Sequence, residues 1–331
     1  MKVGMPRALL YYRYGRFWEE FLAGLGADVV VSGRTDKVLL QNGLGCVSSE
    51  ICLPIKIMAG HLMELTGQVD AVFLPRLMWL EDKLYACPKM IGIVDIARMM
   101  YRERVPLVAP KVEGDLWWPH FRAGMELCHN PVRVVRALAR ARKYLPAHDH
   151  VPDFPVGEKR VALMGHFYNL EDDFISRPMV DTLTSHGYRI CTKDELPEKV
   201  LRNRRGFARN IRWVYERELY NAFQFLSDKV DGVCMIVSMG CGPDSLVAEF
   251  MREEAQQRDL PFLQLVIDEH TGTAGIVTRL EAFVELAARR RARIVQNSES
   301  RDQNSECPEP ESGVLSGGGP RREPPESVAR R

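Results

Sequence analysis

Short apolar runs rich in valine and isoleucine alternate along the chain with longer segments in which apolar residues recur every three or four positions. The short runs are typical of strands buried on both faces, and the longer period is typical of amphipathic helices. Their alternation predicts βαβ units around parallel sheets. The expected strands cover residues 2–5, 28–32, 71–75, 106–109, 160–165, 188–192, 232–238 and 261–268, and the expected helices cover residues 12–25, 54–65, 132–144, 173–186, 208–226, 243–258 and 273–290.

Two segments interrupt this pattern. Residues 146–158 contain three prolines and little periodicity, which favours a linker between domains. After about residue 296 the chain consists mainly of Ser, Glu, Pro, Gly and Arg, and so few apolar side chains cannot offset the entropy lost on ordering. We therefore predict an α/β fold of two doubly wound, Rossmann-like parallel-sheet domains, residues 1–150 and 151–295, followed by a disordered C-terminal tail, residues 296–331.

Composition narrows the classes of partner. The 331 residues carry a formal net charge of +1, which gives no reason to expect nucleic acid as a partner, and no apolar run is long enough to span a membrane. The first residues lead directly into an expected strand and do not resemble a signal peptide, so we expect a cytoplasmic protein. Thiols stay reduced there, so thiolate chemistry or simple burial, rather than disulfides, must explain the eight cysteines.

Three cysteines are each followed within two residues by a proline. These segments are Cys52-Leu53-Pro54, Cys87-Pro88 and Cys241-Gly242-Pro243. Because proline is favoured in the first turn of a helix, each cysteine is expected at a helix N-terminus, where N–H groups stabilise a thiolate. Thiolates bind soft metals and iron–sulfur clusters, and one cluster can take cysteines from distant segments. The alternative is three buried cysteines without a chemical role. Cys307-Pro308 repeats the pattern within the expected tail and serves as a negative control.

Polar residues gather where the expected strands end. Ligands of open parallel sheets bind beyond the carboxyl ends of the strands, so we expect the three cysteines to face one cleft between the domains. Gly240 and Gly242 flank Cys241 and let backbone N–H groups approach an anion. The other residues expected at this cleft are Arg7, Glu50, His166, Tyr168, Asn169, Asp268, Glu269, His270 and Arg279. For the two histidines, a satisfied loop hydrogen bond is the alternative role.

Several of these segments occur together, and in this order, in a known family. They are GMPRAL at residues 4–9, EICLPIK at 50–56, CP at 87–88, GHFYN at 165–169, GCGPD at 240–244 and DEHT at 268–271, continuing to residue 279. The set resembles the activase-related domain of the 2-hydroxyacyl-CoA dehydratase and benzoyl-CoA reductase group over about residues 1–290. The resemblance implies paired Rossmann-like domains around an iron–sulfur cluster, of the 4Fe–4S type, with Cys52, Cys87 and Cys241 as ligands. It also implies an ATP-dependent activator with its own iron–sulfur cluster as electron donor, and a CoA thioester as a candidate substrate.

The sequence departs from members of that group that carry the activator. It lacks their glycine-rich phosphate loops, since Gly317-Gly318-Gly319 is not followed by Lys-Ser or Lys-Thr, so we expect no ATPase activity of its own. Three cysteines also leave one iron of a four-iron cluster without a cysteine. The candidates for that position are water, a substrate oxygen, a second cluster, His166 and Glu269.

Three functions therefore remain open from the sequence. The first is a reductase or dehydratase component that reduces a small molecule in the cleft, with His166, Tyr168 or Glu269 as proton donors. In that case Asp268 and Glu269 either donate protons or orient Arg279. The second is an electron-transfer module or cluster carrier without substrate chemistry. The third is a regulatory binding protein that holds zinc or no metal.

Overall fold

The computed structural model describes residues 1–81, 84–101, 105–146 and 150–305. Met1–Arg291 form one compact unit, and Ala292–Arg331 are grouped as a second. The described part of the second unit is the end of helix α13 (Thr273–Ser305), which continues beyond residue 296. The remainder of the expected tail, including Cys307, lies outside the described residues.

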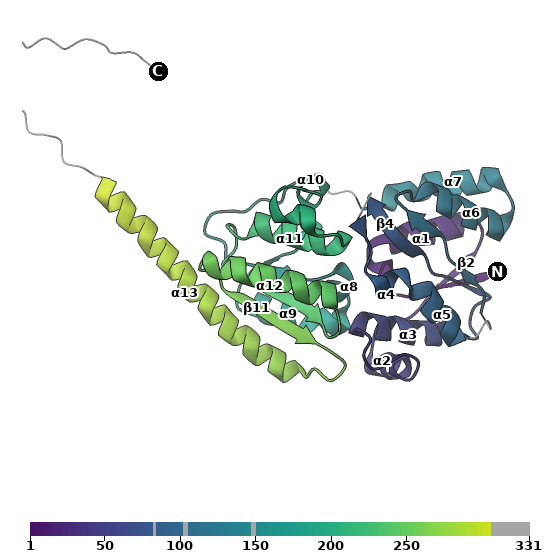
Figure 1. Cartoon of the computed structure of the whole chain (residues 1–331), viewed down its shortest axis with the longest axis horizontal. Coiled ribbons are helices and arrows are strands. Elements are labelled where there is room, and N and C mark those ends of the chain that lie inside the picture. The colour runs from purple at the N-terminus through teal and green to yellow at the C-terminus, as the bar shows by residue number, and fades with distance from the viewer. Residues whose placement is uncertain (82–83, 102–104, 147–149, 306–331) are drawn as a thin grey trace, which may run out of the picture. The chain divides into compact units, whose positions relative to one another are not determined.

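Two parallel sheets within the first unit confirm the predicted α/β class (Figure 1). The first has the strand order β2 (Asp28–Val31), β1 (Lys2–Met5), β3 (Ala71–Phe73) and β6 (Leu107–Val108). The second has the order β11 (Phe262–Ile267), β10 (Gly232–Ser238), β8 (Arg160–Met164) and β9 (Arg189–Cys191). In both sheets the first strand of the half lies between the second and the third, so the strand order reverses beside β1 and beside β8. Such reversal points are where doubly wound sheets bind ligands.

Helices connect these strands along the chain. The first half contains α1 (Tyr11–Gly24), α2 (Lys37–Leu44), α3 (Leu53–Leu65), α4 (Pro88–Ile91), α5 (Ile93–Tyr101), α6 (Trp117–Cys128) and α7 (Pro131–Ala141). The second half contains α8 (Phe167–Leu170), α9 (Asp173–Ser185), α10 (Glu198–Leu201), α11 (Val214–Leu226), α12 (Gly242–Gln257) and α13. Single 3₁₀ turns cover Arg142–Tyr144, Lys193–Glu195 and Gly206–Asn210. Each predicted strand lies within two residues of its expected bounds.

One helix begins later than its apolar period predicted. The pattern placed a helix over residues 208–226, whereas α11 starts at Val214. Gly206–Asn210 form a 3₁₀ turn, and Ile211 and Trp213 are extended. The N–H of Tyr85 donates a 2.9 Å hydrogen bond to the carbonyl oxygen of Arg212, and Trp213 forms a bridge with Tyr85, so this backbone pairs with a strand instead of joining the helix. Tyr85 belongs to a small mixed sheet of β5 (Leu84–Tyr85), β4 (Arg76–Glu81) and β7 (Lys111–Glu113), which the sequence pattern did not predict.

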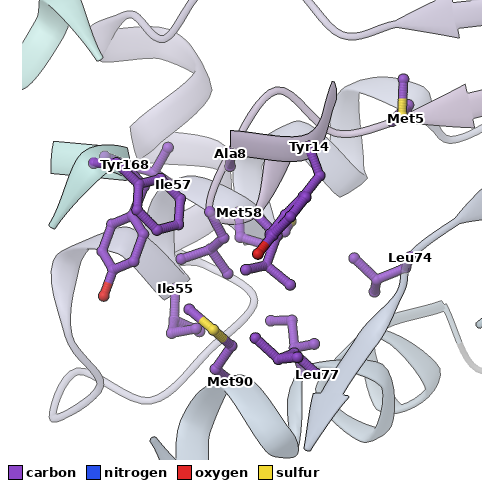
Figure 2. Packing of buried hydrophobic residues seen from close by; sticks show 14 of the residues in the cluster. Met5, Ala8, Tyr14, Ile55, Ile57, Met58, Leu74, Leu77, Met90 and Tyr168 are labelled. Atoms are coloured by element: carbon purple, nitrogen blue, oxygen red, sulfur yellow. The ribbon is translucent and has the colours of Figure 1, made fainter. Parts of the chain in front are cut away.

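Apolar packing is continuous across the two sequence halves of the first unit. Tyr168, from the second half, belongs to the same buried cluster as Ile55, Ile57 and Met90 from the first. Figure 2 shows its ring beside Ile55 and Ile57. Three polar contacts also join the halves: Arg13–Glu218 at 2.8 Å, Thr35–Asp172 at 2.6 Å and Lys56–Glu269 at 2.6 Å. The loops at the ends of the two sheets are therefore fixed against each other.

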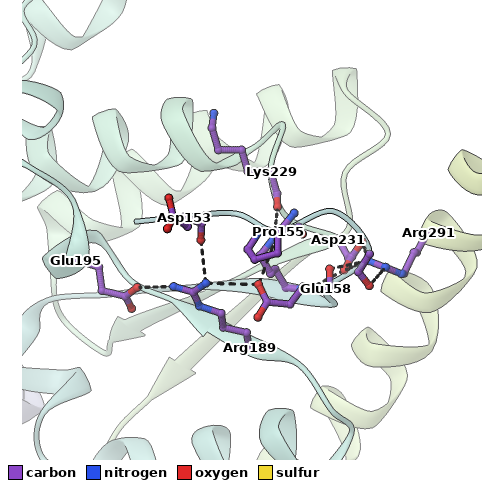
Figure 3. Close-up of polar contacts among 10 residues, drawn as sticks. Asp153, Pro155, Glu158, Arg189, Glu195, Lys229, Asp231 and Arg291 are labelled. Carbon is purple, nitrogen blue, oxygen red and sulfur yellow. Dashed lines mark hydrogen bonds and ion pairs between the residues drawn. The ribbon is translucent and has the colours of Figure 1, made fainter. Parts of the chain in front are cut away.

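The proline-rich segment expected as a linker is held by arginine side chains of the second half (Figure 3). Arg189 donates to the carbonyl oxygen of Asp153 at 2.9 Å, and Arg160 donates to that of Pro155 at 2.7 Å. Arg291, on α13, donates to the carbonyl oxygen of Glu158 at 2.8 Å. Hydrogen bonds therefore connect the described part of this segment to β8, β9 and α13. Among the described helices, none combines the length and apolar character that crossing a bilayer requires.

Candidate metal centre

Each of the three cysteines is the N-cap residue of a helix, which confirms the helix starts predicted from the prolines. Cys52 precedes α3, Cys87 precedes α4 and Cys241 precedes α12. A proline occupies the first or second helical position in all three helices, where its missing N–H costs no helical hydrogen bond. The three thiols therefore stand beside first-turn N–H groups, which have no partner within their own helix.

A glycine turn brings these three segments together. Gly240 has φ +77°, and a Cβ added there would lie 3.0 Å from the carbonyl oxygen of Glu50 and 3.7 Å from the backbone nitrogen of Cys52. Lys89, two residues after Cys87, donates a 2.7 Å hydrogen bond from Nζ to the carbonyl oxygen of Gly240. The turn before Cys241 thus packs against the residues around Cys52 and Cys87. Only glycine allows both this left-handed conformation and this close approach.

The thiols lie close to the buried side chain of Tyr168. Burial raises the pKa of Tyr168 well above its usual range, and the negative forms of Asp244, Cys87, Cys241 and Cys52 raise it further. Cys52 likewise raises the pKa values of both Cys87 and Cys241. Such mutual effects require thiols within electrostatic reach of one another. The structure therefore brings the three predicted cysteines to one place, around a tyrosine that is 7% exposed.

The thiols themselves do not ionise readily, contrary to the expectation from their helix positions. Burial raises the pKa of Cys87 to about 12, and it raises the pKa values of Cys52 and Cys241 as well. Lys89 offsets part of this effect at Cys52, and first-turn N–H groups offset part of it at all three thiols. Desolvation of a buried thiolate outweighs these contributions. A bound metal cation that displaces the thiol protons would make these sulfurs anionic.

His166 lies at the same place, at the end of β8, where the strand order reverses. Its Nε2 atom is 2.7 Å from Asp244 Oδ1 and 3.7 Å from Glu216 Oε1. The exposed fractions of His166, Asp244 and Glu216 are 2%, 0% and 2%. A ring nitrogen of His166, Sγ of Cys241 and a carboxylate oxygen of Asp244 all lie within 4.8 Å of one another. Imidazole, thiolate and carboxylate are all ligands of divalent transition metals.

Charge controls the protonation of this group. Burial alone would lower the pKa of His166, but the neighbouring Asp244 and Glu216 carboxylates outweigh burial and raise it. Burial raises the pKa of Glu216 to about 7, although the nearby imidazole acts in the opposite direction. The next acid along α11 behaves differently: Arg13 and Lys193 overcome burial and hold the pKa of Glu218 at about 2. Arg13 and Lys193 are thus paired with Glu218, not with Glu216 or Asp244.

The sequence analysis did not nominate Asp244 or Glu216. Asp244 follows Cys241 by three residues and therefore lies in the first turn of α12, beside the thiol. The spacing could have identified it, because a carboxylate is favoured at the N-terminus of a helix. Glu216 offers no such signal, since it lies in a run of α11 in which charged and apolar residues are buried alike.

Two further residues expected at the site contact the segments that form it. Asn169 is fully buried, and its Nδ2 donates a 3.2 Å hydrogen bond to Ser238 Oγ, which joins the turn after β8 to the end of β10. Glu50 is exposed and contributes its backbone carbonyl to the contact with Gly240. At Gly242 no described atom would lie within 4 Å of an added Cβ, so that glycine makes no close approach.

The other nominated residues lie elsewhere. Asp268 and His270 form a local turn, in which the N–H of His270 donates to Asp268 Oδ1 at 2.9 Å, and the His270 side chain is 83% exposed. Glu269 pairs with Lys56, and it lines a cavity of about 430 Å³ together with Asp268 and with Leu53, the residue after Cys52.

Arg7 and Arg279 are also outside the cysteine group. Arg7 donates from Nε to the carbonyl oxygen of Ser32 at 3.1 Å and lines a separate cavity with Tyr12 and Thr35. Arg279 is exposed on α13. The site therefore gathers the cysteines, His166 and Tyr168, but not the arginines or the turn at Asp268.

Residues 2–196 match the family described as "CoA enzyme activase uncharacterised domain". The chain belongs to this family. The matched region contains Cys52, Cys87 and His166, whereas Cys241 and Asp244 follow it in the sequence. No curated protein matches the chain.

The donor set of this chain fits a metal centre. Among the residues that the structure describes, the buried atoms without a hydrogen-bond partner include His166 Nδ1 and both carboxylate oxygens of Asp244. Buried polar atoms that lack partners are costly, and several such atoms beside buried thiols are characteristic of a group that binds a cation. Three cysteine sulfurs suit iron–sulfur clusters and other soft metals, while the imidazole and the carboxylate broaden the choice of metal.

Proposed function

We propose that this chain is an iron–sulfur redox protein of the 2-hydroxyacyl-CoA dehydratase and benzoyl-CoA reductase type. Cys52, Cys87 and Cys241 would hold a cluster of the 4Fe–4S type, and the cluster would supply one-electron chemistry. The observation that carries the proposal is the meeting of three helix N-termini, each capped by a cysteine, at the Gly240 turn. A fold that merely buried its cysteines has no reason to cap three converging helices with them.

The surrounding residues suit a low-potential centre. Tyr168 lies beside the thiols, and Cys52 and Cys241 are buried while Cys87 is half-buried, so added negative charge is costly there. First-turn N–H groups of three helices point at the same place and stabilise the thiolates of a bound cluster. Of the proposed proton donors, His166 lies beside Cys241 and Tyr168 lies beside the thiols, while Glu269 is held in an ion pair with Lys56.

We further propose a partner and a substrate class. The family description connects this domain with activation of a CoA enzyme, so an ATP-dependent activator that carries its own cluster is the proposed electron donor. The cavity of about 430 Å³ beside Leu53 is the proposed entry for a small molecule such as a CoA thioester. The thiols require a reducing compartment, which is consistent with the cytoplasm.

The test is anaerobic purification of the full chain, with iron and sulfide supplied, followed by iron, sulfide and zinc analysis. We expect about four iron and four sulfide per chain, a brown chromophore, and an electron paramagnetic resonance signal after reduction. Cys52→Ser, Cys87→Ser and Cys241→Ser should each lose or destabilise the chromophore. Cys46→Ser and Cys191→Ala are the matched controls, since Cys46 Sγ donates to the carbonyl oxygen of Asn42 and Cys191 lies on β9.

Substrate and donor experiments then separate a catalyst from a carrier. Adding the cognate activator, ATP and a strong reductant should reduce the cluster, and the chain alone should hydrolyse no ATP. A catalyst changes its spectrum when its substrate is added, whereas a carrier only passes electrons onward. Stoichiometric zinc, or no metal, in protein made with iron and sulfide would refute the iron–sulfur proposal.

A further inference from the structure

His166, Asp244 and Cys241 form a compact group whose spacing differs from that of a cluster's ligands. Their ligand atoms lie within 4.8 Å of one another, and within the described part of the chain no other three such atoms gather as tightly. Ligands at about 2.0–2.3 Å around one tetrahedral ion lie about 3.5–4 Å apart, so small side-chain rotations would complete such a site. Cysteines on different irons of a cubane lie farther apart, at about 6–7 Å. The compact group therefore matches a single ion.

Acidic side chains also outnumber basic ones within this group. Asp244 and Glu216 are both buried, and each makes its only described ion pair with the single imidazole of His166. The nearby Lys193 pairs with Asp194 at 2.6 Å and with Glu218 at 3.2 Å, and Arg13 pairs with Glu218 at 2.8 Å. A buried carboxylate is stable only when it is paired or coordinates a metal. Two acids and a thiol around one histidine therefore favour a divalent cation.

Hydrogen bonding gives an independent indication. Asp244 Oδ1 has the 2.7 Å ion pair with His166 Nε2, whereas Asp244 Oδ2 and His166 Nδ1 are buried without a hydrogen-bond partner among the described residues. These side chains are fully or almost fully buried, so bulk water does not satisfy them. An unsatisfied acceptor costs about 1–3 kcal/mol, and more when it is charged. Metal coordination would satisfy the carboxylate and the imidazole together.

We infer that a single divalent transition-metal ion, Zn²⁺ or Fe²⁺, binds between His166, Asp244 and Cys241. Three protein ligands leave a fourth tetrahedral position for water or for Glu216. The ion shares Cys241 with the proposed cluster, so the two occupants exclude each other. Bound zinc then blocks cluster assembly, and Cys52 and Cys87 are needed only by the cluster. This mononuclear site does not depend on the proposed redox function.

Cobalt(II) is the probe, added without sulfide to the anaerobic, metal-free full chain. We expect one cobalt per chain, tetrahedral visible bands and a charge-transfer band from one thiolate. Cys241→Ser should remove that band, and His166→Gln and Asp244→Asn should each weaken binding by at least about tenfold, in line with the loss of a ligand. Cys52→Ser and Cys87→Ser are the matched controls and should keep the affinity within about twofold. Circular dichroism establishes that each variant is folded.

X-ray absorption of the zinc-loaded protein gives a second readout, with one sulfur and two or three nitrogen or oxygen ligands expected. The inference is overturned if cobalt does not bind, or if His166→Gln and Asp244→Asn leave the affinity for cobalt unchanged. It is also overturned if Cys52→Ser or Cys87→Ser abolishes cobalt binding. The two proposals fail separately. If the protein binds cobalt but forms no cluster from iron and sulfide, only the redox proposal is refuted. If it forms a cluster but binds no single metal ion, only the mononuclear site is refuted. If both stand, preloaded zinc should slow cluster formation.

Discussion

Lys89 Nζ donates a 2.7 Å hydrogen bond to the carbonyl oxygen of Gly240, and this bond ties the helix that follows Cys87 to the turn that precedes Cys241. The same ammonium lowers the pKa of Cys52 against the larger effect of burial. One side chain thus contacts or influences all three cysteine segments. A positive charge in this position favours any anionic form of the thiols, whichever metal they bind.

Replacing Lys89 with methionine should therefore make the Cys52 thiol harder to ionise. The variant keeps the length of the side chain but loses the charge and the hydrogen bond, so the pKa of Cys52 rises further. At fixed pH, alkylation of Cys52 slows, and its pH profile moves to higher pH; peptide mass spectrometry measures both. Lys89→Arg is the control and should stay close to the wild type. An unchanged profile in Lys89→Met would show that Lys89 does not act on this thiol.

Gly240→Ala should loosen the site where the three segments meet. A side chain at φ +77° costs about 1–2 kcal/mol, and the new Cβ would press on the Glu50 carbonyl oxygen at 3.0 Å. We expect lower stability in urea unfolding and weaker metal binding. Gly242→Ala is the matched control two residues away, where no described atom lies within 4 Å of an added Cβ. Equal effects of the two substitutions would contradict a special role for the Gly240 turn.

The sequence predicted the sheets better than the segments between them. The strands of the two parallel sheets were found because each lies in a short apolar run, and the central strands β8 and β10 are almost wholly buried. The small sheet around β4 was missed, since β5 and β7 span only two and three residues and β4 begins and ends with the charged residues Arg76 and Glu81. Helix α11 was placed too early because its apolar period extends into residues whose backbone pairs with Tyr85 instead. Tertiary pairing of this kind leaves no local signal.

The candidate site was predictable where local rules determine the backbone. The prolines predicted that the three cysteines lie at helix starts, and the predicted end of β8 located His166 in the turn that follows it. Local rules did not give the protonation of the thiols, because desolvation depends on what packs around them. Glu216 was missed for the same reason: it faces His166 from a helix with no chemical signature in the sequence.

The ion pair of Lys56 and Glu269 should contribute to stability because each charge neutralises the other in a partly buried place. Burial would raise the pKa of Glu269, yet Lys56 at 2.6 Å holds it below its usual value. Lys56→Met leaves the half-buried carboxylate without its partner and should lower the free energy of unfolding by about 1–3 kcal/mol. Adding Glu269→Gln to this variant should restore a large part of the loss. A double-mutant cycle in urea measures the coupling, and simple additivity of the two changes would argue against a significant interaction.

His120 should make the protein sensitive to acid. Its Nε2 accepts a 3.0 Å hydrogen bond from Trp18, and burial lowers its pKa to about 4. The unfolded chain therefore takes up a proton near pH 6.5, before the folded chain does. Stability is complete above that pH and falls by about 1.4 kcal/mol per pH unit as the pH drops toward 4. Burial also lowers the pKa of His61 to about 4, so both histidines contribute to the acid sensitivity. His120→Gln should reduce the slope in urea unfolding by about 1.4 kcal/mol per pH unit, whereas His186→Gln, on an exposed residue, should leave it unchanged.

Metal uptake should release protons, because the thiols and His166 hold them more tightly than free side chains do. Burial raises the pKa of Cys241, and its carboxylate neighbours raise the pKa of His166. Binding of Zn²⁺ at pH 7 must displace at least the Cys241 proton, so the apparent affinity rises about tenfold per pH unit for each proton lost. Titration calorimetry in buffers of different ionisation enthalpy counts these protons. Cys241→Ser should reduce the count, whereas Cys191→Ala, a buried thiol on β9, should leave it unchanged. Affinity that is constant between pH 6 and 8 would mean that the thiol is already ionised, and that burial does not control this site.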